Sequence, residues 1–304
     1  MEITASMVKE LRDKTNAGMM DCKKALKETN GDIEKAIDYL REKGLSQAAK
    51  KSGRIAAEGL TTALISTDGK KGVVIEINSE TDFVAKNEEF KNFVTEVAQA
   101  VVDNDPKDLE VLKAVVLNGG KTVQDTLTDK IAKIGENMTV RRFGELKVQN
   151  GVVVDYIHGG GKISVVVALE SEGDIEELSA LGKDLAMQVA AMNPKYISTE
   201  DVDAEFIAHE REILIAQALN EGKPQNIVEK MVEGRLQKEL KEVCLLEQAF
   251  VKDSDMTVKK VISETAKRLS NDIRVTGVLR YEVGEGIEKK SENFADEVAK
   301  QMGL

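Results

Sequence analysis

The spacing of apolar residues predicts three short helices over residues 1–45. Apolar side chains recur there every three or four positions, which is the period of one helix face. Thr4 and Asp32 are typical N-cap residues for the first and third helices, and Gly44 predicts the end of the third. The basic residues 46–56 predict a helical linker to the rest of the chain.

Residues 57–150 change to a mixed pattern of strands and helices. Two apolar runs, 60–66 and 72–77, flank Asp68-Gly69, which is a strong signal for a β-hairpin turn. The segment Thr81-Asp82-Phe83-Val84-Ala85 follows the second run. The spacing then predicts three helices and a strand, near 87–102, 106–117, 122–134 and 138–146.

Residues 151–197 repeat this plan. A strand ends at Tyr156-Ile157-His158, three glycines turn the chain, a second strand runs from Ile163 to Leu169, and a long helix follows. Strand, glycine turn, strand and helix thus occur twice, which indicates an internal duplication. The second copy has Ser171-Glu172-Gly173-Asp174 where the first has its aromatic segment, so the plan itself does not require Phe83.

Residues 198–241 predict a helical hairpin that Ser198 or Thr199 caps. The first arm has the 4-3-4-3 apolar spacing of a two-stranded coil, at Val202, Phe206, His209, Ile213 and Ala216. The turn is expected at Gly222-Lys223-Pro224, and the second arm carries Ile227, Met231 and Leu236. Such a seam can pack within the hairpin, against a partner, or against a second copy of the chain.

The last part of the chain returns to a mixed pattern. Over 242–282 we expect a helix capped by Thr257 and a strand over 273–281. The polar segment 283–304 predicts a short helix near 291–302. The combination of strand hairpins with flanking helices predicts an α+β fold.

Composition favours a cytoplasmic protein and is compatible with a protein partner. The 304 residues suggest about two domains, and a net charge of −11 does not attract nucleic acid or anionic membranes over long range. Cys22 and Cys244 are too far apart for a disulfide framework or a zinc spacing, so both are expected to be reduced. No apolar run approaches the roughly 20 residues of a membrane span, and the N-terminal residues lack the apolar stretch of a signal peptide.

No catalytic, nucleotide-binding or metal-binding motif is complete. Gly119-Gly120-Lys121-Thr122 lacks the first glycine of a phosphate-binding loop, and Gly284-Glu285-Gly286 lacks the third glycine of a dinucleotide-binding turn. The glycines after His158 resemble an esterase oxyanion loop, but the companion Gly-x-Ser-x-Gly motif is missing. The histidines and cysteines form no local ligand cluster. We therefore expect no enzyme activity, no cofactor and no metal, and we expect Thr122 to be a helix cap.

Phe83 and Asp82 each allow two interpretations from the residues alone. Phe83 either packs into the core, as most phenylalanines do, or projects as a wedge toward a partner. Asp82 either caps the following helix or presents its charge to something outside the chain. The spacing does not decide between these alternatives.

Four segments, in their order and spacing, resemble the bacterial elongation factor Ts family. They are 8–26, 81–86, 230–235 and 283–289. The resemblance implies a ubiquitin-associated-like three-helix domain, two related α+β core subdomains, a coiled-coil hairpin inserted in the second, and a C-terminal module. The expected bounds are 1–45 with a linker helix over 46–56, then 57–150, 151–197 with 242–282, 198–241 for the hairpin, and 283–304.

The resemblance also implies a function, because members of this family are guanine-nucleotide exchange factors for elongation factor Tu in translation elongation. By this resemblance Thr81, Asp82, Phe83 and Val84 contact elongation factor Tu, with Phe83 wedged beside the magnesium and phosphate side of its nucleotide site. Secondary contacts are expected at Met19, Met20, Lys23 and His158. A homodimer, or a heterotetramer with the partner, is compatible with the hairpin seam, and no direct contact with nucleic acid or membrane is expected. The competing interpretation is an adaptor whose N-terminal unit binds ubiquitin-like or helical ligands.

Overall fold

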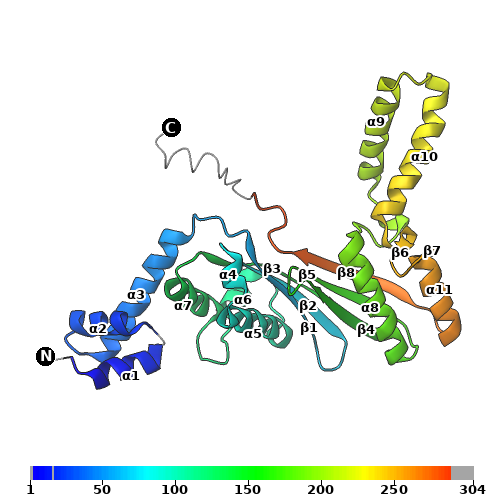
Figure 1. Cartoon of the computed structure of the whole chain (residues 1–304). Helices are drawn as coiled ribbons and strands as arrows, with labels where there is room; N and C mark the ends of the chain where they lie inside the picture. The colour runs from blue at the N-terminus through cyan, green and yellow to red at the C-terminus, as the bar shows by residue number, and fades with distance from the viewer. Residues whose placement is uncertain (1–2, 16, 289–304) are drawn as a thin grey trace. The chain divides into compact units, whose positions relative to one another are not determined.

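The computed structural model describes residues 3–15 and 17–288, and these residues form an α+β structure (Figure 1). The chain divides into two compact units. The first contains residues 1–60, 75–142 and 283–304, and the second contains residues 61–74 and 143–282. The helix predicted near 291–302 lies outside the described residues. Within the described residues, no helix has the length and apolar character needed to cross a membrane.

Three helices open the first unit: α1 (Ala5–Thr15), α2 (Met19–Glu28) and α3 (Ile33–Lys51). Both predicted caps are confirmed, because the Thr4 hydroxyl accepts from the Met7 nitrogen at 3.3 Å and the Asp32 carboxylate accepts from the Lys35 nitrogen at 3.1 Å. The buried faces of the three helices form one small core, made of Val8, Leu11, Cys22, Ala25, Leu26 and Ala36.

The predicted end of the third helix at Gly44 is wrong. Helix α3 continues through Gly44 to Lys51, so the start of the predicted linker helix is its last turn. A glycine inside a helix costs about 1 kcal/mol relative to alanine. Gly44 is buried where α3 packs on α7 (Val123–Ile134), and a Cβ there would lie 3.8 Å from the Cβ of Ala132. That distance is an ordinary van der Waals contact, so the packing of α3 on α7, which local sequence does not reveal, keeps this stretch helical despite its glycine.

The first sheet has the strand order β1-β2-β3, with β1 at Glu58–Ile65, β2 at Lys71–Ser79 and β3 at Met138–Lys147. Four helices lie between β2 and β3 in sequence: α4 (Asp82–Ala85), α5 (Glu88–Asn104), α6 (Leu109–Ala114) and α7. Asn87 caps α5, whose buried face includes Phe90, Phe93, Val94, Val97 and Val101. The hairpin, the helices and the third strand predicted for this region are all confirmed.

The second sheet has the corresponding order β4-β5-β8, with β4 at Gly151–His158, β5 at Ile163–Glu170 and β8 at Arg274–Glu282. All its pairs are antiparallel, and Val167 lies opposite Val154 on one side and Val278 on the other. Helix α8 (Ile175–Met192) packs on β4 and β5. Thr257 caps α11 (Val258–Leu269), which follows the short strands β6 (Ala249–Phe250) and β7 (Asp253–Thr257).

The two sheets share one plan, as the predicted duplication requires. In each, a hairpin is joined by a later strand that pairs with the second strand of the hairpin. They differ after that second strand. In the first copy the extra turn of helix α4 precedes the long helix, whereas in the second Asp174 caps α8 directly. The segment that carries Phe83 is thus an addition to the shared plan.

The helical hairpin consists of α9 (Ala204–Asn220) and α10 (Gln225–Val243), which pack against each other (Figure 1). Ser198 caps only the short 3₁₀ helix η1 (Thr199–Asp201), so its prediction as the cap of the first arm is wrong. Of the predicted seam, His209, Ile213 and Ala216 are exposed, as is Ile227 on the second arm. The side chains that pack within the hairpin include Phe206, Leu214, Ala218, Val228, Val232, Leu236 and Leu240.

The first two predicted positions are confirmed, because Val202 and Phe206 pack in this cluster. The prediction fails after Phe206, where its step of three residues to His209 leads onto the exposed side of α9. Leu214 and Ala218, which are four residues apart, lie on the correct face and are buried. Within the chain, the two arms of the hairpin pack against each other through this face.

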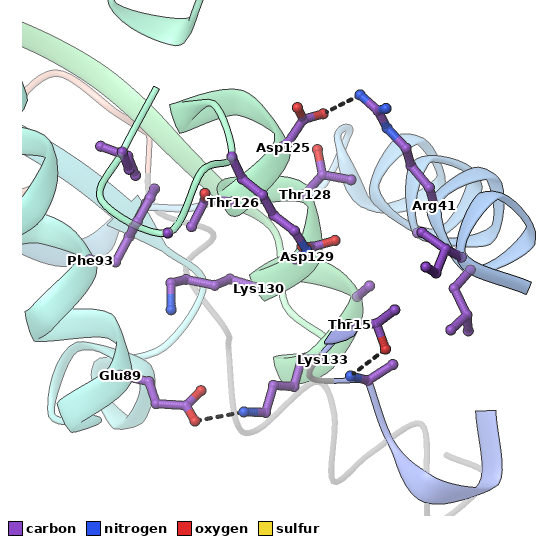
Figure 2. Close-up of a pocket in the computed structure, with 18 of the residues that line it drawn as sticks. Thr15, Arg41, Glu89, Phe93, Asp125, Thr126, Thr128, Asp129, Lys130 and Lys133 are labelled. Atoms are coloured by element: carbon purple, nitrogen blue, oxygen red, sulfur yellow. Dashed lines mark hydrogen bonds and ion pairs between the residues drawn. The ribbon is translucent and has the colours of Figure 1, made fainter. Parts of the chain in front are cut away.

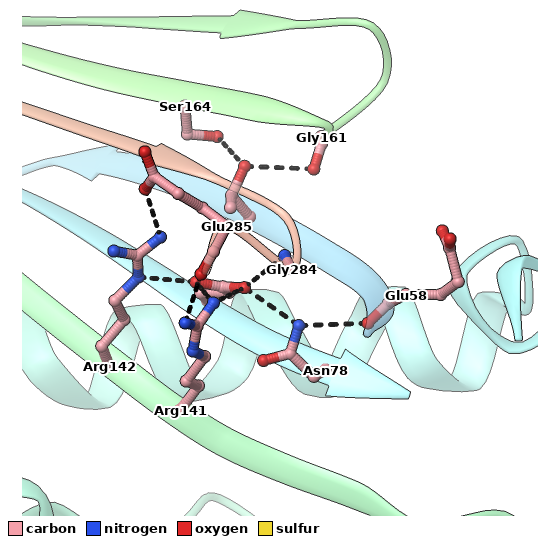
Figure 3. Close-up of polar contacts among 10 residues, drawn as sticks. Glu58, Asn78, Arg141, Arg142, Gly161, Ser164, Gly284 and Glu285 are labelled. Carbon is pink, nitrogen blue, oxygen red and sulfur yellow. Dashed lines mark hydrogen bonds and ion pairs between the residues drawn. The ribbon is translucent and has the colours of Figure 1, made fainter. Parts of the chain in front are cut away.

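A buried carboxylate holds the turn that follows β8 (Figure 3). Glu76 of β2 is fully buried and accepts hydrogen bonds from the Gly284 nitrogen at 2.8 Å and the Asn78 amide at 2.9 Å. Arg141 Nη1 and Arg142 Nε of β3 donate to it at 2.9 and 2.6 Å. Burial raises the pKa of the Glu76 carboxyl, but these hydrogen bonds outweigh it and hold the pKa below its usual value.

The Gly284-Glu285-Gly286 motif is explained by this contact. Gly284 has a φ of +72°, and a Cβ there would lie 2.1 Å from the carbonyl oxygen of Ala57. Only glycine fits that conformation and that close approach. Arg142 Nη2 also pairs with the Glu285 carboxylate at 3.0 Å, so the two residues after Val283 are both fixed by this network.

Candidate functional site

Helix α4 is a single turn that presents one aromatic side chain. Thr81 is its N-cap residue, in an extended conformation, and Asp82 to Ala85 form the turn. Phe83 is 79% exposed, whereas the next two residues, Val84 and Ala85, are buried, with only 6% and 4% of their surface exposed. Of the two interpretations of Phe83, packing into the core is therefore wrong for this structure, and the ring projects outward.

Asp82 is not the helix cap. It is the first residue of α4, and its carboxylate pairs with Lys86 Nζ at 2.7 Å, one helical turn further on. The same Nζ lies 5.9 Å from the centre of the Phe83 ring, within the range of a cation–π contact. Exposed ion pairs contribute only about 0–1 kcal/mol, so the Asp82–Lys86 pair adds little to the stability of α4. The segment thus combines an exposed ring with a neighbouring pair of opposite charges.

Thr81 uses its polar groups within the unit. Glu136, in the connection between α7 and β3, accepts from the Thr81 nitrogen at 3.0 Å and from the Thr81 hydroxyl at 2.8 Å. Glu136 was not identified from the sequence, because it lies 55 residues from Thr81 in an ordinary polar turn after a helix. No local spacing connects the two residues.

The predicted secondary residues Met19, Met20 and Lys23 lie together at the start of α2. Met19 is 59% exposed and Met20 is 77% exposed. They border a groove of about 1100 Å³ whose floor includes Ile3 and Val8 of the same unit. Its charged lining is largely basic, with one aspartate, Asp13, against Lys9, Arg12, Lys14, Lys23 and Lys121. In a chain of net charge −11 this is a local basic surface around an apolar floor.

A second cavity, of about 630 Å³, is lined by residues of α3, α5 and α7 (Figure 2). Most of its cations are paired within it: Arg41 with Asp125 at 2.9 Å, Lys133 with Glu89 at 2.6 Å, and Lys121 with Asp129 at 2.5 Å. Lys130 instead lies 5.5 Å from the centre of the Phe93 ring, and burial lowers its pKa. With its charges matched internally, the cavity has no excess charge that would select a ligand.

The same cavity settles the interpretation of Gly119-Gly120-Lys121-Thr122. Lys121 forms an ion pair with Asp129, and the Thr122 hydroxyl accepts a hydrogen bond from the Asp125 nitrogen at 3.0 Å. Thr122 is therefore the N-cap of α7, as predicted. The motif serves the start of a helix rather than a phosphate.

His158 belongs to the second unit, whereas Phe83 and Met20 belong to the first. It ends β4 immediately before the turn over 159–161, and it is exposed. Its Nδ1 lies 3.1 Å from the Tyr156 hydroxyl, two residues earlier on the strand.

The predicted contact residues of the first unit form two groups. Thr81, Asp82, Phe83 and Val84 lie together because they are adjacent in sequence, and Met19, Met20 and Lys23 lie together at the start of α2.

Comparisons with known proteins identify the family. The model of the family described as "Elongation factor TS" matches residues 80–285, a range that contains Phe83 and His158. Three relatives named elongation factor Ts are similar over 99% of both chains. They come from Clostridioides difficile strain 630, with 59% identity over 300 residues, Clostridium perfringens strain SM101, with 56% over 301, and Clostridium tetani strain Massachusetts, with 55% over 302. The family match spans more than half of the chain and the relatives cover nearly all of it, so the chain belongs to the elongation factor Ts family.

Proposed function

We propose that this chain is a guanine-nucleotide exchange factor for elongation factor Tu. It binds the GDP-bound partner, disturbs the magnesium and phosphate side of the nucleotide site, and promotes GDP release so that GTP can bind during translation elongation. Membership of the elongation factor Ts family supports the choice of partner. The observation that carries the mechanism is the 79% exposure of Phe83 on a turn whose next two residues are buried.

The energy for exchange comes from binding alone, since no covalent bond is made or broken. Burying a fully exposed phenylalanine side chain contributes about 1.5–3 kcal/mol. That energy is gained only when the partner opens to accept the Phe83 ring, so the chain binds the opened, nucleotide-free state more tightly. By linkage, the affinity of GDP for the complex falls by the same factor by which GDP weakens binding of the chain.

The binding energy of the Phe83 ring acts on the groups of the partner that hold the magnesium ion. A bound divalent cation is the strongest local charge in a phosphate site, and moving the groups that hold it weakens the grip on the phosphates. Phe83 supplies the displacement, and Asp82, released from Lys86, accepts a donor of the partner beside it. Val84 and Ala85 are buried in their own unit, so they hold α4 in place when the Phe83 ring enters the partner.

Two further surfaces support the same complex. The basic groove beside Met19 and Met20 fits an apolar surface of the partner bordered by acidic side chains. His158, at the exposed end of β4, offers a ring nitrogen to a second part of the partner. These contacts strengthen binding to elongation factor Tu, whereas Phe83 accelerates the release of GDP.

The test is the release of fluorescent GDP from elongation factor Tu in the presence of Phe83→Ala. We expect release at least about tenfold slower than with the wild-type chain, which corresponds to about 1.4 kcal/mol of lost binding to the opened state. The matched control is Ile175→Ala, which removes another exposed apolar side chain, 54% exposed, from α8 of the other unit. It is expected to leave release unchanged. Wild-type rates with Phe83→Ala would refute the wedge, and stable binding without any exchange by the wild-type chain would favour an adaptor.

A further inference from the structure

Two connections in the first unit exchange hydrogen bonds through their glutamates. Glu136, between α7 and β3, accepts from both the nitrogen and the hydroxyl of Thr81, at 3.0 and 2.8 Å. Glu80, between β2 and α4, accepts from the Asn137 nitrogen at 2.5 Å. Each connection therefore supplies the acceptor for the other, and neither moves alone without breaking a charge-assisted hydrogen bond.

Arg54, just beyond α3, completes this arrangement. Its Nη2 pairs with Glu80 at 2.6 Å, and its carbonyl oxygen accepts from the Asn137 side-chain amide at 2.7 Å. The Glu80 side chain is only 11% exposed and Asn137 is buried, so the acceptor side of this arrangement is shielded from water, whereas the Arg54 side chain is 54% exposed. Three stretches of chain that are distant in sequence meet here. We call Arg54, Glu80, Thr81, Glu136 and Asn137 the carboxylate clamp.

Helix α4 depends on outside support because it is a single turn. One isolated turn fixes several residues for very few hydrogen bonds and is not stable alone. Thr81 occupies its N-cap position, yet the Thr81 side chain makes no capping bond to α4 and donates to Glu136 instead. Val84 and Ala85 anchor the turn from within, and the carboxylate clamp fixes the residue immediately before it. The direction of Phe83 follows from both.

We infer that Glu136 is a positioning residue for Phe83 in nucleotide exchange, and this inference rests on the wedge role proposed above. Without the Glu136 carboxylate, the Thr81 nitrogen and hydroxyl lose their common acceptor, and the start of α4 samples more orientations. Only a fraction of molecules then presents the ring as the partner requires, and apparent affinity falls in proportion to that fraction. If about one tenth remains competent, exchange slows about tenfold.

The experiment compares GDP release from elongation factor Tu for a small set of variants of the full chain. Glu136→Ala removes both acceptor oxygens and is expected to slow release about tenfold. Thr81→Val removes only the hydroxyl and is expected to be slower than Thr81→Ser, which keeps it. The control is Glu172→Ala, which removes an exposed glutamate from the connection between β5 and α8 in the second unit and is expected to match the wild type. Thermal unfolding of each variant shows whether it is folded, and Glu136→Gln, which keeps the shape and one acceptor, replaces Glu136→Ala if that variant fails to fold.

The decisive readout is the double variant Phe83→Ala with Glu136→Ala. A positioning residue has nothing to position once the ring is gone, so the double variant is expected to release GDP no more slowly than Phe83→Ala alone. Independent, additive slowing would overturn the inference and leave the proposed function intact, as would a normal rate with Glu136→Ala beside a slow Phe83→Ala. A normal rate with Phe83→Ala would overturn both.

Discussion

Replacing Glu76 with alanine should destabilise the protein more than any surface change, because the carboxylate is the common acceptor of four donors. The Glu76 side chain has no exposed surface, and the side chains of Arg141 and Arg142 are only 26% and 29% exposed. In Glu76→Ala both guanidinium groups keep their charge in a mostly buried place and lose the carboxylate. The nitrogen of Gly284 also loses its acceptor, and the amide of Asn78 loses one of two, since it also donates to the carbonyl oxygen of Glu58.

The magnitude follows from the cost of breaking a buried ion pair by removing one partner, which is about 3–5 kcal/mol. Native proteins unfold at a cost of about 5–15 kcal/mol, so this loss is a large part of the total. With an m-value of about 3 kcal/mol per molar urea, the unfolding midpoint falls by about 1–1.7 M. Circular dichroism at a helix band measures it, because the chain contains no tryptophan to follow by fluorescence.

The matched control is Glu170→Ala on β5. Glu170 also pairs with an arginine, Arg274, at 2.7 Å, but the two side chains are 35% and 76% exposed. An exposed pair of this kind contributes about 0–1 kcal/mol, so the expected change in the free energy of unfolding is small. If Glu76→Ala cost less than about 1 kcal/mol at an unchanged m-value, burial and hydrogen bonding at Glu76 would not stabilise the fold as argued.

Two further predictions test the pH dependence of this network and the corrected hairpin seam. The pKa of Glu76 lies below its usual value, so its charge stabilises the folded chain above the unfolded pKa of about 4.3, and this contribution is lost as the pH falls through the folded pKa. The difference in unfolding free energy between the wild type and Glu76→Gln should therefore stay constant from pH 8 to about pH 5 and shrink below about pH 4; a constant difference at low pH would contradict this sign. In the hairpin, Leu214→Ala should cost about 2–5 kcal/mol in urea denaturation and Ile213→Ala less than about 0.5, and the reverse order would restore the seam predicted from spacing.

Local signals in the sequence predicted much of the fold. Asp32, Thr122 and Thr257 were predicted as caps because each places a side-chain oxygen just before an apolar repeat, and each accepts from a nearby backbone nitrogen. The two strand hairpins followed from glycine turns between apolar runs. In these cases the residues that determine the structure lie within a few positions of each other.

Contacts between distant segments explain what could not be predicted. Gly44 stays helical because α3 packs on α7 there, and the buried face of α9 runs from Phe206 to Leu214 because that side packs against α10. The prediction of the candidate site was limited in the same way by contacts between distant residues. Phe83 was identified through the family resemblance of residues 81–86, whereas Glu136 was missed because it lies 55 residues away from Thr81.

Exchange by this chain is measured by following release of fluorescent GDP from elongation factor Tu after mixing with the wild-type chain. We expect release to accelerate with chain concentration until it saturates. We also expect chelation of magnesium to speed release by itself and to shrink the acceleration due to the chain, because both act on the same ion. If the chain bound elongation factor Tu without changing GDP release, the exchange function would be contradicted.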